Sequence, residues 1–229
     1  MPEAKKQTTR ILRRPEEIAR LDPDLNPYSA KLLAHKDRIW YGSPAESAGF
    51  AEFVHAPLVV DLGCGSGMFL QQFAALHPEM HCLGFELRFK RLVRAAEKYD
   101  HRGLTNIRLV RALAEEVGNW LEPASVNLLH VNFPDPWAKP RQRKHRLIQP
   151  GFVDQVHRLL KPQGRFVFKT DHQEYYLSSL EFLCQDSRFQ VRAQTQDLHT
   201  TSIFNLETEF ERLFKGKNTK VCYVELEKN

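Results

Sequence analysis

The amino-acid sequence predicts an α/β fold: a doubly wound, mostly parallel sheet of seven strands with one antiparallel edge strand. Two observations predict it. From residue 57 onward, short apolar runs alternate with segments whose apolar residues recur at helical spacing, which is the pattern of βαβ units. The chain has 229 residues, of which 42% are hydrophobic, and this suits one domain with a substantial core.

The first half of this pattern contains four strands. The run at 57–63 is short and apolar and ends at glycines, as a buried strand does. The helix after it carries Phe69, Leu70 and Phe73 at helical spacing. The expected elements are a strand at 57–63, a helix at 67–76, a strand at 81–87, an amphipathic helix with a basic face at 88–100, a strand at 106–112, a helix at 114–121 and a strand at 125–133.

The second half adds three strands. A helix can begin at Pro150, and the sequence K-P-Q-G at 161–164 ends it. A strand at 165–170 and a helix at 174–184 follow. The runs at 189–195 and 220–227 indicate two late strands with no convincing helix between them. We expect these two strands to pair antiparallel at the edge of the sheet.

Residues 1–56 lack the alternation of strands and helices. We expect them to form a basic, helical or irregular extension that is partly disordered, and residues 57–229 to form the domain. The cations of the extension suit either a solvated tail or an arm that touches RNA. They are Lys5, Lys6, Arg10, Arg13 and Arg14.

Composition argues against several classes of protein. No apolar run approaches the roughly 20 residues that span a bilayer, and the N-terminus lacks the apolar segment of a secretory signal. No two of the four cysteines are spaced C-x-x-C, so neither a zinc site nor a redox dithiol is indicated, and no metal is expected. We expect reduced thiols and a cytoplasmic location. The net charge of +5 is modest, but its local clustering favours polyanions.

Glycines follow the first strand in the sequence D-L-G-C-G-S-G at 61–67. Their spacing is G-x-G-x-G, and Met68 stands where a dinucleotide-binding loop has its third glycine. Asp61 would repel a pyrophosphate, but it suits the positive sulfonium and amino group of S-adenosylmethionine. Glu86 ends the second strand, where a carboxylate accepts hydrogen bonds from both ribose hydroxyls. A lone glycine turn indicates only a tight connection, whereas this combination predicts a methyltransferase-like pocket.

A carboxylate lies between two prolines after the fourth strand, in the sequence F-P-D-P-W. Pro134 and Pro136 restrict the backbone, so Asp135 has a fixed direction and can accept hydrogen bonds from the N1–H and N2–H edge of guanine. Trp137 can stack on a base or on adenine, and the cations at 139–146 can hold phosphates. Taken singly, the proline pair suits a simple turn, Trp137 suits a cap on the core, and the cation run suits a solvated face. Taken together, they indicate a functional site.

The combination resembles the bacterial tRNA (guanine-N7-)-methyltransferase family, over roughly residues 57–217. The resemblance implies a Rossmann-like class I methyltransferase fold and S-adenosylmethionine as cofactor. It further implies methyl transfer to N7 of a guanosine in tRNA, in the variable loop, to form 7-methylguanosine. The motifs that carry it are F-P-D-P-W at 133–137, Lys139, the Arg/Lys run at 141–146, the Thr-Asp pair at 170–171, and T-E-F-E at 208–211 followed by Lys215 and Lys217.

The motifs and the resemblance together assign roles to particular residues. Asp135 is the expected catalytic residue, and with Asp171 it grips the guanine edge and stabilises positive charge rather than acting as an obligate base. The expected cofactor contacts are Asp61, Gly63, Gly65, Glu86, Leu113 and Asp135. The expected substrate contacts are Lys139, Asp171, Thr208 and Glu211, and the expected RNA contacts are Arg141, Arg143, Lys144 and Arg146.

Leu113 departs from the family pattern, which usually offers Asp or Asn to the adenine at this position. Either a backbone group or Glu115 would serve there, or adenine binding is weaker. Asp61 is a milder departure, since many members have Glu. We expect tRNA as the partner, no obligatory protein partner, and a monomer or homodimer.

Three alternatives remain at this stage. The sequence N-F-P-D-P-W, which begins at Asn132, loosely resembles the (D/N)-P-P-(Y/F/W) motif of enzymes that methylate exocyclic amino groups, although Asp135 interrupts the proline pair. A catalytically silent RNA-binding protein is a second alternative, which Leu113 favours weakly. A nicotinamide oxidoreductase is disfavoured by the glycine spacing.

Overall fold

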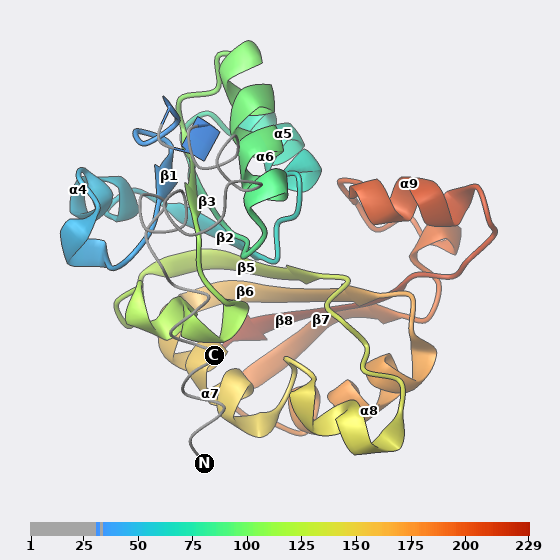
Figure 1. Cartoon of the computed structure of the whole chain (residues 1–229). Helices are drawn as coiled ribbons and strands as arrows, with labels where there is room; N and C mark the ends of the chain where they lie inside the picture. The colour runs from blue at the N-terminus through green and yellow to red at the C-terminus, as the bar shows by residue number, and fades with distance from the viewer. Residues whose placement is uncertain (1–30, 33) are drawn as a thin grey trace.

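The computed structural model describes residues 31–32 and 34–229, and in it eight strands form one sheet (Figure 1). Their order is β1-β4-β3-β2-β5-β6-β8-β7, and every neighbouring pair up to β6 is parallel. β8 runs antiparallel to both β6 and β7. The strands are β1 (Ile39–Trp40), β2 (Leu58–Leu62), β3 (His81–Phe85), β4 (Ile107–Val110), β5 (Val126–Asn132), β6 (Leu160–Thr170), β7 (Phe189–Thr195) and β8 (Cys222–Lys228).

The predicted fold class is confirmed, and so is the antiparallel pairing of the two late strands. Two details of the prediction differ from the structure. The sheet has an eighth strand, β1, which has two residues and is too short to show any periodicity. The antiparallel strand is β8, which lies one position in from the edge because it inserts between β6 and β7.

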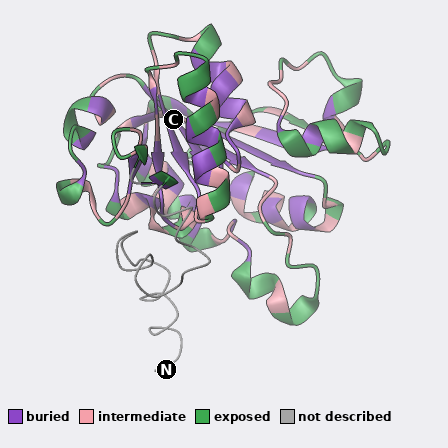
Figure 2. Cartoon of the chain, turned by 45° about the horizontal axis from the view of Figure 1, so that its top comes forward, coloured by how far each residue is buried: buried purple, intermediate pink, exposed green. Residues whose placement is uncertain are grey.

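Helices cover both faces of the sheet, because successive strand residues point to opposite faces. On β2, Val59 packs with the helices at 68–76 and 89–101, whereas Leu58 and Val60 pack with the helices at 50–54, 150–159 and 173–183. Figure 2 shows the buried residues along the strands and the inward helix faces. The helices are α4 (Phe50–Val54), α5 (Met68–Leu76), α6 (Phe89–His101), α7 (Pro150–Leu159), α8 (Gln173–Leu183) and α9 (Glu209–Lys215), with 3-10 turns η2 (Pro44–Glu46), η3 (Ala114–Asn119), η4 (Pro140–His145) and η5 (Leu198–Thr200).

Two helix predictions are wrong. The helix expected at 114–121 is the 3-10 turn η3, where Gly118 weakens any longer helix. The segment between β7 and β8, expected to lack a helix, contains α9. The Thr208 side chain caps α9, and the Glu211 carboxylate accepts from the Thr208 backbone N–H, which is a capping box. The T-x-x-E spacing of this box was visible in the sequence.

Part of the predicted N-terminal extension packs onto the sheet. β1 pairs with β4, and the Trp40 ring makes edge contacts with Phe50 and Phe53 at 5.1 and 5.5 Å. The basic residues at 5–14 lie outside the described residues, and the domain boundary at residue 57 stays a prediction. No helix in the described part of the chain is long and apolar enough to cross a membrane.

Candidate functional site

The glycine turn joins β2 to α5 at the carboxyl end of the sheet. Gly63, Gly65 and Gly67 have φ angles of +76°, +59° and +77°, a conformation that favours glycine. The backbone N–H groups of Gly63 and Cys64 donate to the Phe85 carbonyl at 2.8 and 2.9 Å, which ties the turn to β3. A Cβ atom on Gly67 would lie 1.9 Å from the Tyr99 hydroxyl. Glycine is therefore required at position 67 both by conformation and by space.

Asp61 and Asn132 meet beside this turn. β2 and β5 are parallel neighbours, so both side chains lie near the carboxyl end of the sheet. Asp61 is 2% exposed, and its Oδ1 accepts a hydrogen bond from Asn132 Nδ2 at 3.0 Å. Burial raises the pKa of Asp61 to about 7, against the opposing effects of the Asn132 hydrogen bond and the charge of Lys169.

The other polar atom of Asn132 has no partner. Its Oδ1 is buried, and it accepts no hydrogen bond from any residue in the described ranges. Asn132 lines both the main cavity and a small one of about 30 Å³ beside the glycine turn. The pair thus offers a buried carboxylate and an open acceptor to a ligand that brings N–H donors and positive charge.

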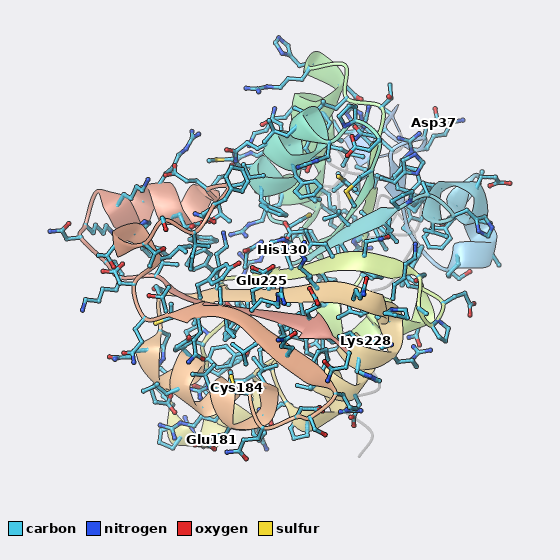
Figure 3. The ribbon with its side chains drawn as sticks, turned by 180° about the vertical axis from the view of Figure 1, so that it is seen from behind. Asp37, His130, Glu181, Cys184, Glu225 and Lys228 are labelled. Atoms are coloured by element: carbon cyan, nitrogen blue, oxygen red, sulfur yellow. The ribbon has the colours of Figure 1, made fainter. Side chains whose placement is uncertain are left out.

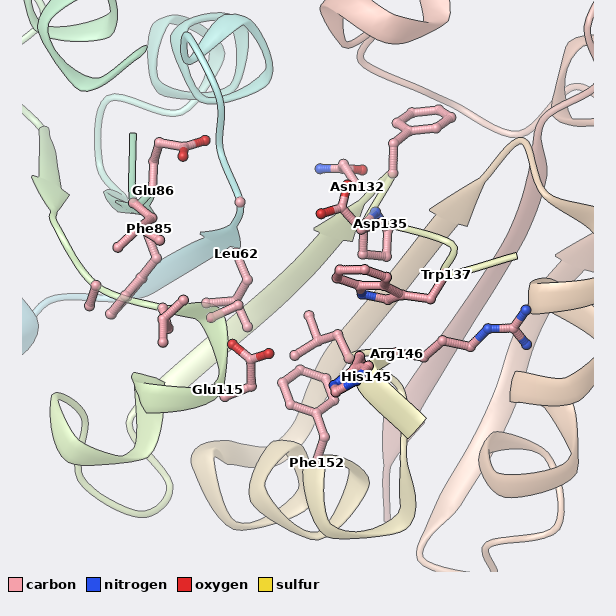
Figure 4. A pocket seen from close by; sticks show the side chains of 18 of the residues that line it. Leu62, Phe85, Glu86, Glu115, Asn132, Asp135, Trp137, His145, Arg146 and Phe152 are labelled. Carbon is pink, nitrogen blue, oxygen red and sulfur yellow. The ribbon is translucent and has the colours of Figure 1, made fainter. Parts of the chain in front are cut away.

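Glu86 directly follows β3 and lines the main cavity, whose volume is about 830 Å³ (Figure 4). Its Oε1 accepts from the Arg88 backbone N–H at 2.8 Å, and its Oε2 lies 3.9 Å from Arg91 Nη1. Phe85 and Phe152 also line this cavity, so one wall is apolar and aromatic. A carboxylate next to an apolar wall suits a ribose joined to a flat base.

Leu113 follows β4 and also lines the cavity. Its N–H donates to Glu116 Oε2 at 3.1 Å, and its carbonyl accepts from the Glu116 N–H at 3.1 Å. Both backbone groups at this position are therefore used within η3. The Glu115 carboxylate is exposed, lines the cavity and has no side-chain partner in the part of the chain that the structure describes. A backbone group at 113 and the Glu115 side chain were the two expected substitutes for the adenine contact. Of these, Glu115 is the one still available.

The F-P-D-P-W segment forms the opposite wall of the cavity. Figure 4 shows Asp135 and Trp137 on the side of Asn132, across from Leu62 and Glu86. Phe133 and Trp137 have φ angles of +54° and +42°, which are uncommon for residues with side chains and cluster at functional sites. Asp135 is exposed, and Trp137 is 36% exposed with its ring 5.5 Å from that of His145. The segment thus presents an acid and a flat aromatic at the cavity rim.

The cations after Trp137 divide into two groups. Lys139, Arg141, Arg143 and Lys144 are exposed on or next to η4, and Arg143 forms an ion pair with Glu174 at 3.3 Å. Arg146 is buried instead. Its guanidinium binds Glu174, donates to the Pro136 carbonyl at 2.9 Å and lies over the Tyr175 ring. These contacts fasten the segment to α8, and the RNA contact expected of Arg146 stays a prediction.

The residues predicted near the C-terminus lie in different settings. Asp171 is exposed directly after β6, and Thr208 caps α9 and lines the small cavity. Glu211 is fully buried, and it accepts from Lys169 Nζ at 2.9 Å and from Asn205 Nδ2 at 2.7 Å. The substrate contact expected of Glu211 stays a prediction. Its carboxylate is enclosed and holds α9 against β6.

Asn132 lines the site, and the charge of Lys169 lowers the pKa of Asp61; both residues were absent from the predicted set of site residues. Lys169 is 1% exposed although it carries an amine, and burial lowers its pKa. A lysine inside the apolar run R-F-V-F-K-T was the signal for a buried partner. The described residues contain no group of three or more His, Cys, Asp or Glu side chains that could hold a metal ion.

Comparison with protein families gives a match over most of the chain. The model of the family Methyltransf_4, described as "Putative methyltransferase", matches residues 55–224. A tRNA (guanine-N(7)-)-methyltransferase from Mycoplasma pneumoniae is 34% identical over 176 residues, which are 75% of this chain and 84% of that protein. A bifunctional glycosyltransferase/methyltransferase from Fusobacterium nucleatum is 35% identical over 211 residues, 89% of this chain. The chain spans only 33% of that protein's length.

Solved structures share the fold. The 16S rRNA methyltransferase KamB superposes with a TM-score of 0.62 at 16% identity, over 84% of this chain and 99% of that one. At this identity the likeness concerns the arrangement of the sheet and helices alone.

Proposed function

The chain belongs to the Methyltransf_4 family of methyltransferases, and from this premise we propose that it methylates N7 of a guanosine in tRNA. The family implies S-adenosylmethionine as co-substrate. The finer proposal rests on the F-P-D-P-W segment, which places Asp135 on the rim of the cavity that Glu86 and Asn132 also line. The tRNA (guanine-N(7)-)-methyltransferase relative from Mycoplasma pneumoniae supports it.

The residues around the glycine turn fit S-adenosylmethionine, which, when bound, supplies a methyl group on a positive sulfonium. Asp61 and the open Oδ1 of Asn132 would accept hydrogen bonds from its ammonium group. Glu86 would accept from the ribose hydroxyls, and Phe85 and Glu115 would contact the adenine. Gly63 and Gly65 would let the backbone approach the ligand closely.

Guanine N7 carries a lone pair in the ring plane, so its methylation needs no prior deprotonation. The base becomes positive as the bond forms. The protein therefore has to align N7 and to place negative charge nearby. We assign this role to Asp135, whose direction Pro134 and Pro136 fix. Asp171 would grip the guanine edge from the end of β6.

Phosphates that flank the target would lie on the exposed cations of η4, Arg141, Arg143 and Lys144, and on Lys139 before it. These side chains follow the Asp135 segment directly, so a backbone held there brings its base to the cavity. We propose tRNA as the partner and the cytoplasm as the compartment, which suits four free cysteines.

The test is the identity of the methylated nucleoside. The protein is incubated with unmodified tRNA and labelled S-adenosylmethionine, and the RNA is digested to nucleosides and separated. We expect all label in 7-methylguanosine. Label in a methylated adenosine would instead support methylation of an exocyclic amine. No label, together with no calorimetric binding of S-adenosylmethionine, would support a silent RNA-binding protein.

A further inference from the structure

A stripe of cations runs along α6, on the face of the sheet opposite to η4. Lys90, Arg94, Lys98 and Arg102 recur every fourth residue and therefore lie on one side of the helix. Like charges at this spacing repel one another and destabilise an isolated helix. A helix that keeps four of them in register is suited to meeting a polyanion.

Two of these cations have no carboxylate partner. Lys98 pairs with Glu209 of α9 at 2.8 Å and donates to the Ser66 carbonyl at 3.1 Å. Arg94 and Arg102 are exposed, and neither guanidinium forms an ion pair with any residue of 31–32 or 34–229. The adjacent acid Glu97 is occupied by Lys31 at 3.0 Å. The charges of Arg94 and Arg102 are therefore not neutralised by a neighbouring carboxylate in the described ranges.

Arg94, Lys98 and Arg102 of the stripe line a groove of about 1010 Å³ between α6 and α9. Figures 1 and 3, which view the molecule from opposite sides, both place α9 beside α5 and α6. From α9, Arg212 adds a further cation, which pairs with Glu207 at 3.6 Å, and Leu213 lies 61% exposed at the same groove. His101 of α6 also lines the groove.

The far wall of the groove is firmly anchored. Gln72 Nε2 donates to the Glu207 carbonyl at 2.7 Å, Lys98 holds Glu209, and the buried pair of Lys169 and Glu211 joins α9 to β6. The groove is thus formed before any ligand arrives, which reduces the ordering that binding requires.

The groove adjoins the methyl-donor site. Met68 and Glu209 line both the groove and the small cavity beside the glycine turn, and Phe210 of α9 lines the main cavity. The cations of η4 lie by α8, on the other face of the sheet, where Arg143 pairs with Glu174. Cationic surfaces therefore flank the cavity on both faces of the sheet.

We infer that the groove between α6 and α9 is a second RNA-contacting surface, which holds backbone phosphates of the same RNA whose base enters the main cavity. The inference rests on the proposed function and extends it. Phosphate contacts fix the register of a nucleic acid without reading its sequence, and Arg94, Arg102 and Arg212 offer such contacts. One RNA held at two surfaces has its target base positioned from both sides.

The test compares two double variants. Arg94→Ala with Arg102→Ala removes two groove cations, and Arg165→Ala with Arg192→Ala removes two exposed arginines from β6 and the edge strand β7. Dissociation constants for unmodified tRNA are measured over a range of salt concentrations. We expect the groove variant to lower the log–log salt slope by about two units, roughly one per lost phosphate contact. The affinity for S-adenosylmethionine should match that of the control variant.

Equal salt slopes in the groove variant and the control variant would overturn the inference. This outcome is separable from failure of the proposed function, because tRNA affinity and nucleoside identity are independent readouts. If the unaltered protein forms 7-methylguanosine and the groove variant keeps its slope, only the inference fails. If the unaltered protein forms none but the groove variant loses tRNA affinity, only the proposed reaction fails.

Discussion

Asp61 is a buried carboxyl group whose pKa is raised by its surroundings. Burial raises its pKa to about 7, partly opposed by Asn132 and Lys169, and Glu86 adds to the rise. A cationic ligand favours the carboxylate form, so its binding lowers this pKa and releases a proton. Below pH 7 the Asp61 carboxyl group of the free protein holds a proton that must leave when the ligand binds. The apparent affinity for S-adenosylmethionine therefore falls as pH decreases.

The measurement is calorimetric titration with S-adenosylmethionine between pH 6 and pH 8, in buffers with different ionisation enthalpies. We expect proton release near pH 7 and weaker binding at pH 6, by up to about tenfold per pH unit. The variant Asp61→Asn should bind weakly and without this pH dependence. Identical affinity of the unaltered protein at pH 6 and pH 8 would contradict the assignment of Asp61.

Asp135 is the residue that the proposal places nearest to the reacting base. In Asp135→Asn and Asp135→Ala we expect turnover to fall about a hundredfold or more, because charge that forms on the guanine loses its partner. A matched control is Asp154→Asn, an exposed acid on α7 outside the cavity. Near-normal turnover of the Asp135 variants in a single-turnover assay would remove this residue from the mechanism.

At the scale of single elements, Arg141 and Arg143 of η4 are cations that do not line the main cavity. We expect Arg141→Ala with Arg143→Ala to raise the KM for tRNA and to leave affinity for S-adenosylmethionine unchanged, since phosphate contacts are the interactions removed. The salt slope of tRNA binding should fall by between one and two units, because Arg143 is already shared with Glu174. A large loss of donor binding in this variant would show that η4 shapes the cavity instead.

α9 depends on a buried ion pair. Lys169 and Glu211 are 1% and 0% exposed, so removing one partner leaves an uncompensated charge in the interior. We expect Lys169→Met to lower the free energy of unfolding by about 3–5 kcal/mol. Adding Glu211→Gln removes the second charge and should recover part of the loss, since the amide oxygen can still accept from the Thr208 N–H. Denaturant unfolding of the single and double variants measures these free energies of unfolding. If the losses of the two substitutions simply add, Lys169 and Glu211 are not coupled.

The sequence predicted those elements whose signal is local. The strands around residues 58–62 and 81–85 are short apolar runs between turns, and the glycine turn follows from its own spacing. Asp61, Glu86 and Asp135 could be placed because strand ends of a parallel sheet meet at one edge. These three residues do line the two adjoining cavities.

What the sequence did not predict depends on partners far away in the chain. Arg146 was counted as a surface cation, but it meets Glu174 across 28 positions. Glu211 was counted as a substrate contact, but it meets Lys169 across 42 positions. A local pattern carries no information on such pairs, because burial is decided by which elements pack together.

At the scale of the whole molecule, the two proposed RNA-contacting surfaces lie on either side of the cavity. The cavity lies at the carboxyl end of the sheet, and cations on α6 and on η4 flank it from the two faces. The net charge of +5 is modest, so these local surfaces, rather than a global excess, would attract phosphate.

The most direct measurement is to map the methylated position on tRNA. Unmodified tRNA is incubated with the protein and S-adenosylmethionine, reduced, and treated with aniline, which cleaves the chain at 7-methylguanosine. We predict one break, in the variable loop, that is absent without S-adenosylmethionine. Methyl label incorporated without any break would contradict the central claim, because methylation would then occur at an atom other than guanine N7.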